Sequence, residues 1–215
     1  MEDNKKNVGS RQSRNEFVIA GTIVRKYCSK NFTVITVITR NSTPNFPQIY
    51  CYRDCKRFVD GLAPHSNVTI KGRVSTFRAK DGSDTPHQVL TAESVKLSKP
   101  TMSTAFGDGY QGKAYLYPNT NALFIAGEIV YVSGTDRIKK YLVKVEGVKH
   151  PAFIQITQYV QKRAPRFAVG DFINAYCDIQ TVRKERDDSF VDFVNFVMLE
   201  AHRVKENGEE EENDD

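Results

Sequence analysis

The stretch Phe17-Val-Ile-Ala-Gly-Thr-Ile-Val24 returns later in the chain as Leu123-Phe-Ile-Ala-Gly-Glu-Ile-Val130, which aligns Gly21 with Gly127 at an offset of 106 residues. A second pair of segments supports the repeat, because Val74-Ser-Thr-Phe-Arg78 aligns with Ile179-Gln-Thr-Val-Arg183 at an offset of 105. Self-similarity at this distance is typical of a duplicated domain. The sequence therefore predicts two related units of about 85 residues each.

Each unit contains five segments that are rich in β-branched and aromatic residues and are separated by Gly, Pro and Asn breaks. We expect strands at about 16–27, 31–40, 47–53, 66–78 and 87–97, and again at about 122–132, 138–146, 152–160, 169–183 and 189–204. A short helix is expected over 54–62, with Asp54 as its N-cap and with Gly61 and Pro64 ending it. In the second unit we expect at most a short turn before Val169. Five strands with a helix between the third and fourth are the plan of the OB-fold, so we predict an all-β protein with short helices, built as two tandem OB-fold five-stranded Greek-key barrels.

The expected organisation has five parts. They are a basic, disordered N-terminus at 1–15, a first OB-fold at 16–98, a linker at 99–121, a second OB-fold at 122–205 and an acidic, disordered tail at 206–215. Seven of the 26 acidic residues fall in this tail, so the rest of the chain carries 31 basic and 19 acidic residues and a net charge of +12. A basic body with an acidic tail is typical of a protein that handles a polyanion, and a merely solubilising tail is the alternative.

Several function classes lack sequence support. No apolar run approaches the roughly 20 residues of a membrane span, and no secretory signal opens the chain, so a cytoplasmic location is expected. The four cysteines form no C-x-x-C pair and the four histidines are scattered, so no metal and no cofactor are expected. A nuclease would need clustered carboxylates, and the acids outside the tail are dispersed. We therefore expect a protein that is not an enzyme.

The expected strand faces of the first unit indicate what it binds. In its fourth strand Val68 and Ile70 share one parity with Gly72 and Val74, whereas Lys71, Arg73 and Phe77 share the other. In its third strand Tyr50 and Tyr52 lie on the parity opposite Ile49 and Cys51. Cations interleaved with aromatic side chains suit an unpaired strand, because cations bind its phosphates while aromatic rings stack on its bases. The alternative is that these aromatic residues complete a second, minor core.

Candidate nucleic-acid-binding residues follow from this pattern. In the first unit they are Arg25, Lys26, Phe32, Arg40, Phe46, Tyr50, Tyr52, Arg53, Lys71, Arg73, Phe77 and Arg78. In the second unit they are Lys139, Lys140, Lys144, Lys162, Arg163 and Arg166. Asp178 stands where the first unit has Arg73, so the first unit is expected to be the main binding platform.

The chain resembles the single-stranded DNA-binding proteins of bacteria and their phages. The resemblance is carried by Ile19-Ala-Gly-Thr-Ile23, by Gln48-Ile-Tyr-Cys-Tyr-Arg53 before a short helix, by Asn67-Val-Thr-Ile-Lys-Gly-Arg-Val74 and by the acidic C-terminal segment. It implies stacking aromatic residues at Phe46 and Tyr52. It also implies a homodimer, because most members assemble four OB-folds and this chain carries two.

We therefore expect a protein that coats and protects single-stranded DNA during replication, recombination or repair, at the nucleoid or at viral replication sites. Its tail, Glu206 to Asp215, is expected to contact replication and recombination proteins. Two alternatives stay open on the sequence: an OB-fold protein that binds RNA, and a protein-binding scaffold of replication or recombination.

Overall fold

The computed structural model describes residues 11–40, 44–77, 87–98, 120–147, 150–160, 164–186 and 189–204, without the side chains of Arg40, of 183–186 and of 189–192. The first half contains β1 (Arg14–Cys28), β2 (Phe32–Arg40), β3 (Pro44–Asn45), β4 (Gln48–Tyr52), α1 (Arg53–Asp60), β5 (Asn67–Phe77) and β6 (His87–Leu97). The second half contains β7 (Thr120–Gly134), β8 (Ile138–Val145), β9 (Ala152–Tyr159), β10 (Phe172–Arg186) and β11 (Ser189–Arg203).

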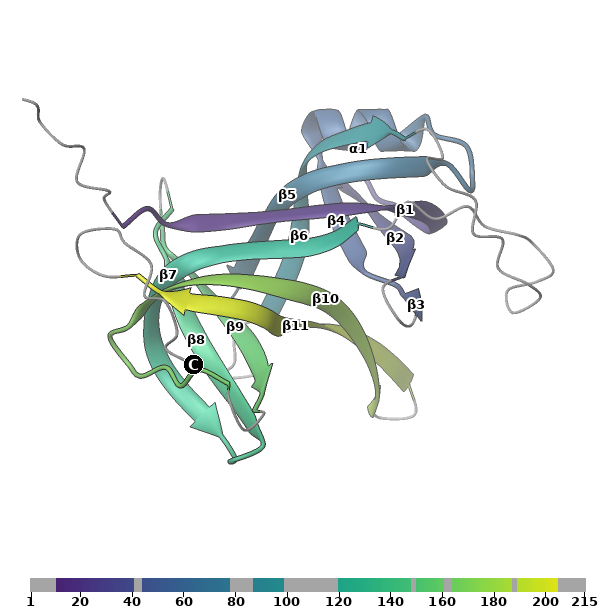
Figure 1. Cartoon of the computed structure of the whole chain (residues 1–215). Coiled ribbons are helices and arrows are strands. Elements are labelled where there is room, and N and C mark those ends of the chain that lie inside the picture. The colour runs from purple at the N-terminus through teal and green to yellow at the C-terminus, as the bar shows by residue number, and fades with distance from the viewer. Residues whose placement is uncertain are drawn as a thin grey trace, which may run out of the picture.

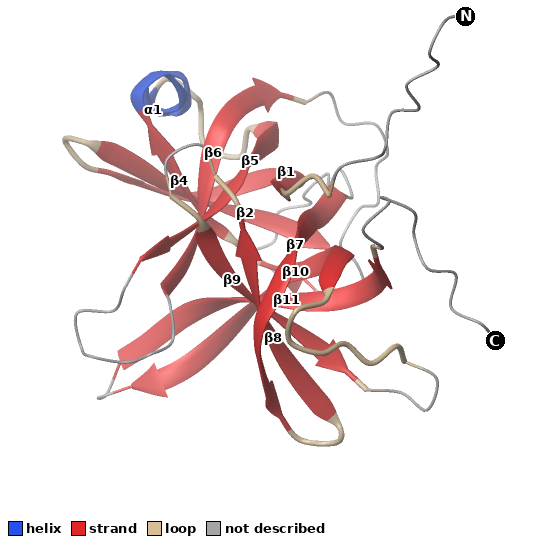
Figure 2. Ribbon diagram, turned by 90° about the vertical axis from the view of Figure 1, so that its left-hand side faces the viewer, coloured by secondary structure: helices blue, strands red, loops and turns tan. Residues whose placement is uncertain are grey.

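Both halves close into five-stranded barrels. In barrel 1 the strands pair as β1–β2, β2–β4, β4–β6, β6–β5 and β5–β1, with β4–β6 parallel and the others antiparallel. In barrel 2 the pairs are β7–β8, β8–β9, β9–β11, β11–β10 and β10–β7, with β9–β11 parallel. Figures 1 and 2 show the two barrels next to each other, with α1 at the outer end of barrel 1. The predicted class of two tandem OB-folds is confirmed.

The strand bounds follow the hydrophobic alternation closely, because side chains of one parity fill each barrel. Ile35 and Val37 of β2, Ile49 and Cys51 of β4, and Val68 of β5 are fully buried. The helix differs from the prediction at its start. Tyr52 is the N-cap and Asp54 lies inside the first turn, so the predicted N-cap is wrong. The chain passes directly from β4 into α1, so the last residue of β4 is also the N-cap, and Arg53, the first helical residue, has a φ of 48°.

The two barrels are joined by their first strands. β1 and β7 run antiparallel, and Phe17 lies opposite Leu123 in the register. These two residues are equivalent in the sequence repeat, so the seam lies on a pseudo-twofold axis that exchanges the barrels. The seam makes one eleven-stranded sheet of the whole fold (Figure 1). Across it, the guanidinium of Arg14 lies 4.4 Å from the centroid of the Phe124 ring.

The repeat holds at the level of single contacts. A Cβ at Gly21 would clash with the carbonyl oxygen of Ile38, and a Cβ at Gly127 would clash with that of Lys144. The side-chain amide of Asn15 donates to the carbonyl of Val74 at 2.8 Å and its oxygen accepts from the Val74 amide at 2.9 Å. The amide of Asn121 donates in the same way to the carbonyl of Ile179, at 2.8 Å.

The second halves of the barrels also reach across the seam. Gln88 of β6 donates to the backbone carbonyl of Gln155 in β9 and accepts from its amide. From the other side, the Thr181 amide of β10 donates to the side-chain oxygen of Asn45 in β3 at 3.3 Å. Each barrel therefore contacts the other through its last hairpin as well as its first strand.

Candidate nucleic-acid interface

Aromatic side chains gather on the outward face of β2 and β4 in barrel 1. Phe32 lies directly opposite Tyr52 in the register, and Tyr50 lies opposite Val34. The ring of Phe32 is 5.7 Å from the ring of Tyr50 and 6.1 Å from that of Tyr52, centroid to centroid, with both pairs tilted. Since the neighbouring Thr33, Ile35, Ile49 and Cys51 fill the barrel interior, these rings point outward. We call Phe32, Tyr50 and Tyr52 the aromatic face.

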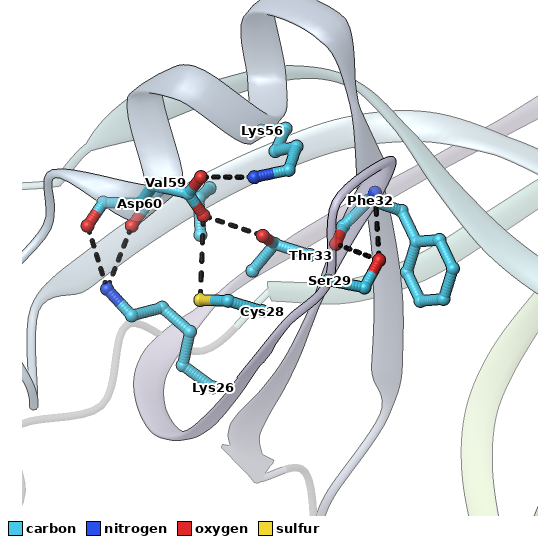
Figure 3. Close-up of polar contacts among 8 residues, drawn as sticks. All are labelled: Lys26, Cys28, Ser29, Phe32, Thr33, Lys56, Val59 and Asp60. Carbon is cyan, nitrogen blue, oxygen red and sulfur yellow. Dashed lines mark hydrogen bonds and ion pairs between the residues drawn. The ribbon is translucent and has the colours of Figure 1, made fainter.

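Local structure holds the aromatic face in place. The tight turn from β1 into β2 is closed by Ser29, whose amide and hydroxyl both donate to the carbonyl of Phe32 at 2.9 Å (Figure 3). The Phe32 amide donates back to the Ser29 hydroxyl at 3.2 Å. At the other end of the face, Tyr52 is half exposed. Its partial burial raises the pKa of its hydroxyl, and the nearby Tyr50 phenol raises this pKa further. Tyr52 is therefore a neutral ring whose surface is available for stacking.

Phe46 does not join this face. It is half-buried in a separate small cluster with Ile38 and Val24, on the outward side of β1 and β2. A small second cluster therefore exists around Phe46, and it does not contain Tyr50, Tyr52 or Phe77, for which the sequence left a minor core open as an alternative. A role of Phe46 in binding stays a prediction.

The predicted cations near the aromatic face have different surroundings. Arg25 and Arg53 are exposed. The Lys26 ammonium donates to three carbonyl oxygens at the end of α1, those of Val59, Asp60 and Leu62, at 3.0 to 3.3 Å. Lys26 thus stabilises the C-terminus of α1, where a positive charge is favourable (Figure 3). The Arg40 side chain and Arg78 lie outside the described residues.

Lys71, Arg73 and Phe77 lie on another wall of the barrel. In barrel 1 β5 pairs with β1 and β6, so it stands opposite the β2–β4 wall that carries the aromatic face. All three side chains are exposed, and Arg73 forms an ion pair with Glu93 at 3.5 Å. The structure therefore does not bring these three residues together with Tyr50 and Tyr52. Their role in binding stays a prediction.

The equivalent face of barrel 2 keeps a ring only at the position of Tyr52, where it has Tyr159, and carries a lysine at its centre. Ile138, Lys140 and Thr157 occupy the positions of Phe32, Val34 and Tyr50. Lys140 is exposed, Lys139 is half-buried, and the Lys144 ammonium forms an ion pair with Glu146 at 2.7 Å, which raises the pKa of this lysine. Arg166 is exposed, whereas Lys162 and Arg163 lie outside the described residues.

Three surface residues of these faces were missed by the sequence analysis. Tyr27, near the end of β1, is 63% exposed, and Lys30 in the following turn is exposed. In barrel 2 Tyr159 is 52% exposed and occupies the position of Tyr52. The bulge between Ile23 and Arg25 in β1 shifts the alternation, so the side on which Tyr27 lies does not follow from the parity of the residues before it.

The described part of the chain contains neither a metal-ion cluster nor a membrane-spanning helix. No three His, Cys, Asp or Glu side chains come close enough together there to hold a metal ion. None of its helices is long and apolar enough to cross a membrane, since α1 has only eight residues.

The fold has counterparts among solved structures. The single-stranded DNA-binding protein from Thermus aquaticus matches with a TM-score of 0.60 and 13% sequence identity, covering 90% of this chain and 94% of that chain. Its deletion mutant with residues 228–252 removed matches with the same TM-score and 14% identity, covering 90% and 96%. No family model and no curated protein matches the sequence. At such low identity the comparison shows a shared fold.

Proposed function

We propose that this protein binds single-stranded DNA with little sequence preference and so coats and protects unpaired strands during replication or recombination. The aromatic face of barrel 1 is the observation that carries the proposal. Three rings lie together on an outward strand face, Tyr52 among them half exposed. Each base stacked on such a ring contributes about 1 to 3 kcal/mol, and every base offers a ring face. The Thermus aquaticus protein of the same fold is, by its name, a single-stranded DNA-binding protein.

The phosphates of the strand would contact the basic surface. Arg25 and Arg53 are exposed on barrel 1 near the aromatic face, and Lys140 is exposed on the equivalent face of barrel 2. The net charge of +12 outside the acidic tail draws a polyanion to this surface at long range. Stacking and ion pairing make and break no covalent bond, so the proposed function is binding without catalysis.

The assembly and partners are part of the same proposal. A homodimer would bring four barrels together, and the acidic segment from Glu206 to Asp215 would contact replication and recombination proteins or compete with DNA for the basic surface. Deletion of residues 206–215 is then expected to tighten DNA binding at low salt. An unchanged affinity would leave the tail a solubilising role.

Fluorescence anisotropy with labelled oligo-dT, oligo-rU and duplex DNA at about 50 and 200 mM salt tests the function. Tight binding to oligo-dT with weak binding to the duplex is the expected result. Preference for oligo-rU would show an RNA-binding protein, and absence of binding to all three would favour the protein-binding scaffold.

A further inference from the structure

Tyr27 lies in the same cross-strand row as Tyr50. In the register Tyr27 of β1 is opposite Val34 of β2, and Val34 is opposite Tyr50 of β4. Directly paired residues of antiparallel strands point to the same side of the sheet. Val34 alternates with the fully buried Thr33 and Ile35, so this row lies on the outward face of barrel 1.

The spacing of this row suits a flat ring. Neighbouring strands are about 4.8 Å apart, so Tyr27 and Tyr50 start about 10 Å from each other, with the aliphatic Val34 between them. Stacked aromatic rings prefer centroid separations of about 4.5 to 7 Å. One ring placed over Val34 can therefore contact a tyrosine on each side.

Tyr27 is free to make such a contact. It is 63% exposed, the most exposed aromatic side chain among the described residues. Tyr50, by contrast, is half-buried and already packs against Phe32. Arg25 lies two residues before Tyr27 on the same side of β1, opposite Thr36, and is also exposed. A cation thus stands one row away from the groove, where the phosphate of a bound nucleotide can reach it.

Barrel 2 has the same row with different chemistry. Ser133, Lys140 and Thr157 pair across β7, β8 and β9 in place of Tyr27, Val34 and Tyr50. Neither end of this row carries a ring, and a lysine stands at its centre. A base-binding groove at this position is therefore a property of barrel 1 and not of the fold.

We infer that Tyr27, Val34 and Tyr50 form a nucleobase-binding groove on barrel 1, in which Tyr27 stacks on a base that lies over Val34. This inference rests on the proposed function and assigns Tyr27 as a base-contacting residue beyond the aromatic face.

The test compares Tyr27→Leu with wild type on two oligonucleotides of equal length and charge, oligo-dT and an abasic oligomer without bases. Leucine keeps an apolar side chain but removes the ring. We expect Tyr27→Leu to lower the affinity for oligo-dT at least about fivefold and to leave the affinity for the abasic oligomer unchanged. Tyr27→Phe, which keeps the ring, should bind oligo-dT like wild type.

Tyr131→Leu is the matched control, because Tyr131 is 59% exposed on the equivalent strand of barrel 2 but lies opposite Leu142 in another row. Equal losses for Tyr27→Leu and Tyr131→Leu, or equal losses on both oligomers, would overturn the groove. If wild type and Tyr27→Leu bind oligo-dT with equal affinity, the groove is overturned and the proposed function is not. A wild-type protein that does not bind oligo-dT would overturn the proposed function itself.

Crosslinking gives a second readout that does not depend on variant stability. Oligo-dT carrying 5-iodouracil crosslinks to aromatic side chains that stack on the modified base. Wild-type protein should crosslink at Tyr27 when it is irradiated with this oligomer, as identified by peptide mass spectrometry. Crosslinks that include Tyr52 but never Tyr27 would overturn the inference.

Discussion

The two barrels share interior contacts but present different side chains on their outer faces. Gly21 and Gly127 each lie against a carbonyl of the neighbouring strand, and Asn15 and Asn121 each hydrogen-bond to the strand beside them. On the outward β2–β4 face, however, the Phe32 position of barrel 1 is Ile138 in barrel 2. A close-packed interior constrains every side chain, whereas an outward position can change without cost to the fold. The duplicated chain can therefore keep one architecture while the outer faces of its two halves differ.

The largest expected effect tests whether the interiors of the two barrels are packed alike. In Gly21→Ala and Gly127→Ala the new methyl group meets a backbone carbonyl that cannot rotate away. We expect each change to lower the free energy of unfolding by about 3 kcal/mol, at the upper end of typical overpacking costs. Urea unfolding measures the loss. A large loss in only one barrel would show that the two barrels are not packed alike. Gly61→Ala, where the nearest atom is 3.6 Å away, is the control for the loss of a glycine.

The next effect tests the difference between the faces. Tyr52 and Tyr159 are equivalent and both exposed, but only Tyr52 adjoins the ring of Phe32. Tyr52→Ala should weaken binding to oligo-dT by about 1 to 3 kcal/mol with little change in salt dependence. Tyr159→Ala should cost less, because its register partner Ile138 offers no ring. Anisotropy titrations at two salt concentrations measure both. Equal losses would mean that the two barrels stack bases equally.

The asparagine pair tests how far the repeat extends. Asn15 makes two hydrogen bonds to Val74, whereas the buried side-chain oxygen of Asn121 has no partner within the described part of the chain. Asn15→Ala should cost about 1.5 kcal/mol in unfolding free energy, because it leaves backbone groups of Val74 unpaired. Asn121→Ala should cost less, about 0.5 to 1 kcal/mol, since it also removes an unpaired oxygen. Chemical denaturation of both variants measures the order, and the reverse order would show that the second hydrogen bond of Asn15 does not add to stability.

Much of the fold could be predicted from the sequence because it depends on alternation and on the repeat. The buried parity of β2, β4 and β5 places these three strands within a few residues. The seam was not predicted, since pairing of β1 with β7 depends on the pseudo-twofold axis rather than on either strand alone. The helix start was missed because Tyr52 makes no side-chain cap hydrogen bond, and a search for capping residues therefore favours Asp54.

The candidate site was less predictable than the fold. Parity placed Tyr50 and Tyr52 on one outward face, and the structure agrees. Sequence alone could not show that the Lys26 ammonium is held by the end of α1, because this contact joins residues more than thirty positions apart. Nor could it show that Lys71 stands on the opposite wall, since that depends on the order of strands around the barrel.

Lys26 of barrel 1 and Lys140 of barrel 2 are expected to have different roles, the first in stabilising the fold and the second in binding phosphates. Lys26→Met should lower the free energy of unfolding by about 0.3 to 1 kcal/mol through the loss of the charge at the end of α1. It should leave the salt dependence of DNA binding unchanged. Lys140→Met should leave the free energy of unfolding unchanged. It should reduce the slope of log K against log salt by about 0.7. Thermal unfolding and salt titrations of both variants decide the matter. A reduced slope for Lys26→Met would assign that lysine to the phosphates as the sequence predicts.

The smallest expected effect concerns Asp60, for which barrel 2 has no equivalent helix among its described residues. The Lys56 ammonium and then the Thr33 hydroxyl hydrogen-bond to the Asp60 carboxylate and lower its pKa below the ordinary value (Figure 3). A lowered folded-state pKa favours the ionised form, so the carboxylate stabilises the fold above pH of about 4 and this contribution is lost as the pH falls through the lowered value. Asp60→Asn should therefore be less stable than wild type at neutral pH, and the difference should shrink in acid.

Unfolding free energies of both proteins at several pH values between about 2.5 and 7 measure this difference. Asp136→Asn, in the exposed turn between β7 and β8, is the control and should leave the stability unchanged throughout. A difference for Asp60→Asn that stays constant down to the lowest pH would mean that its hydrogen bonds act without the charge. The attachment of α1 to barrel 1 would then depend on uncharged hydrogen bonds, on the burial of Val59 and on the contacts of Lys26 with the end of the helix.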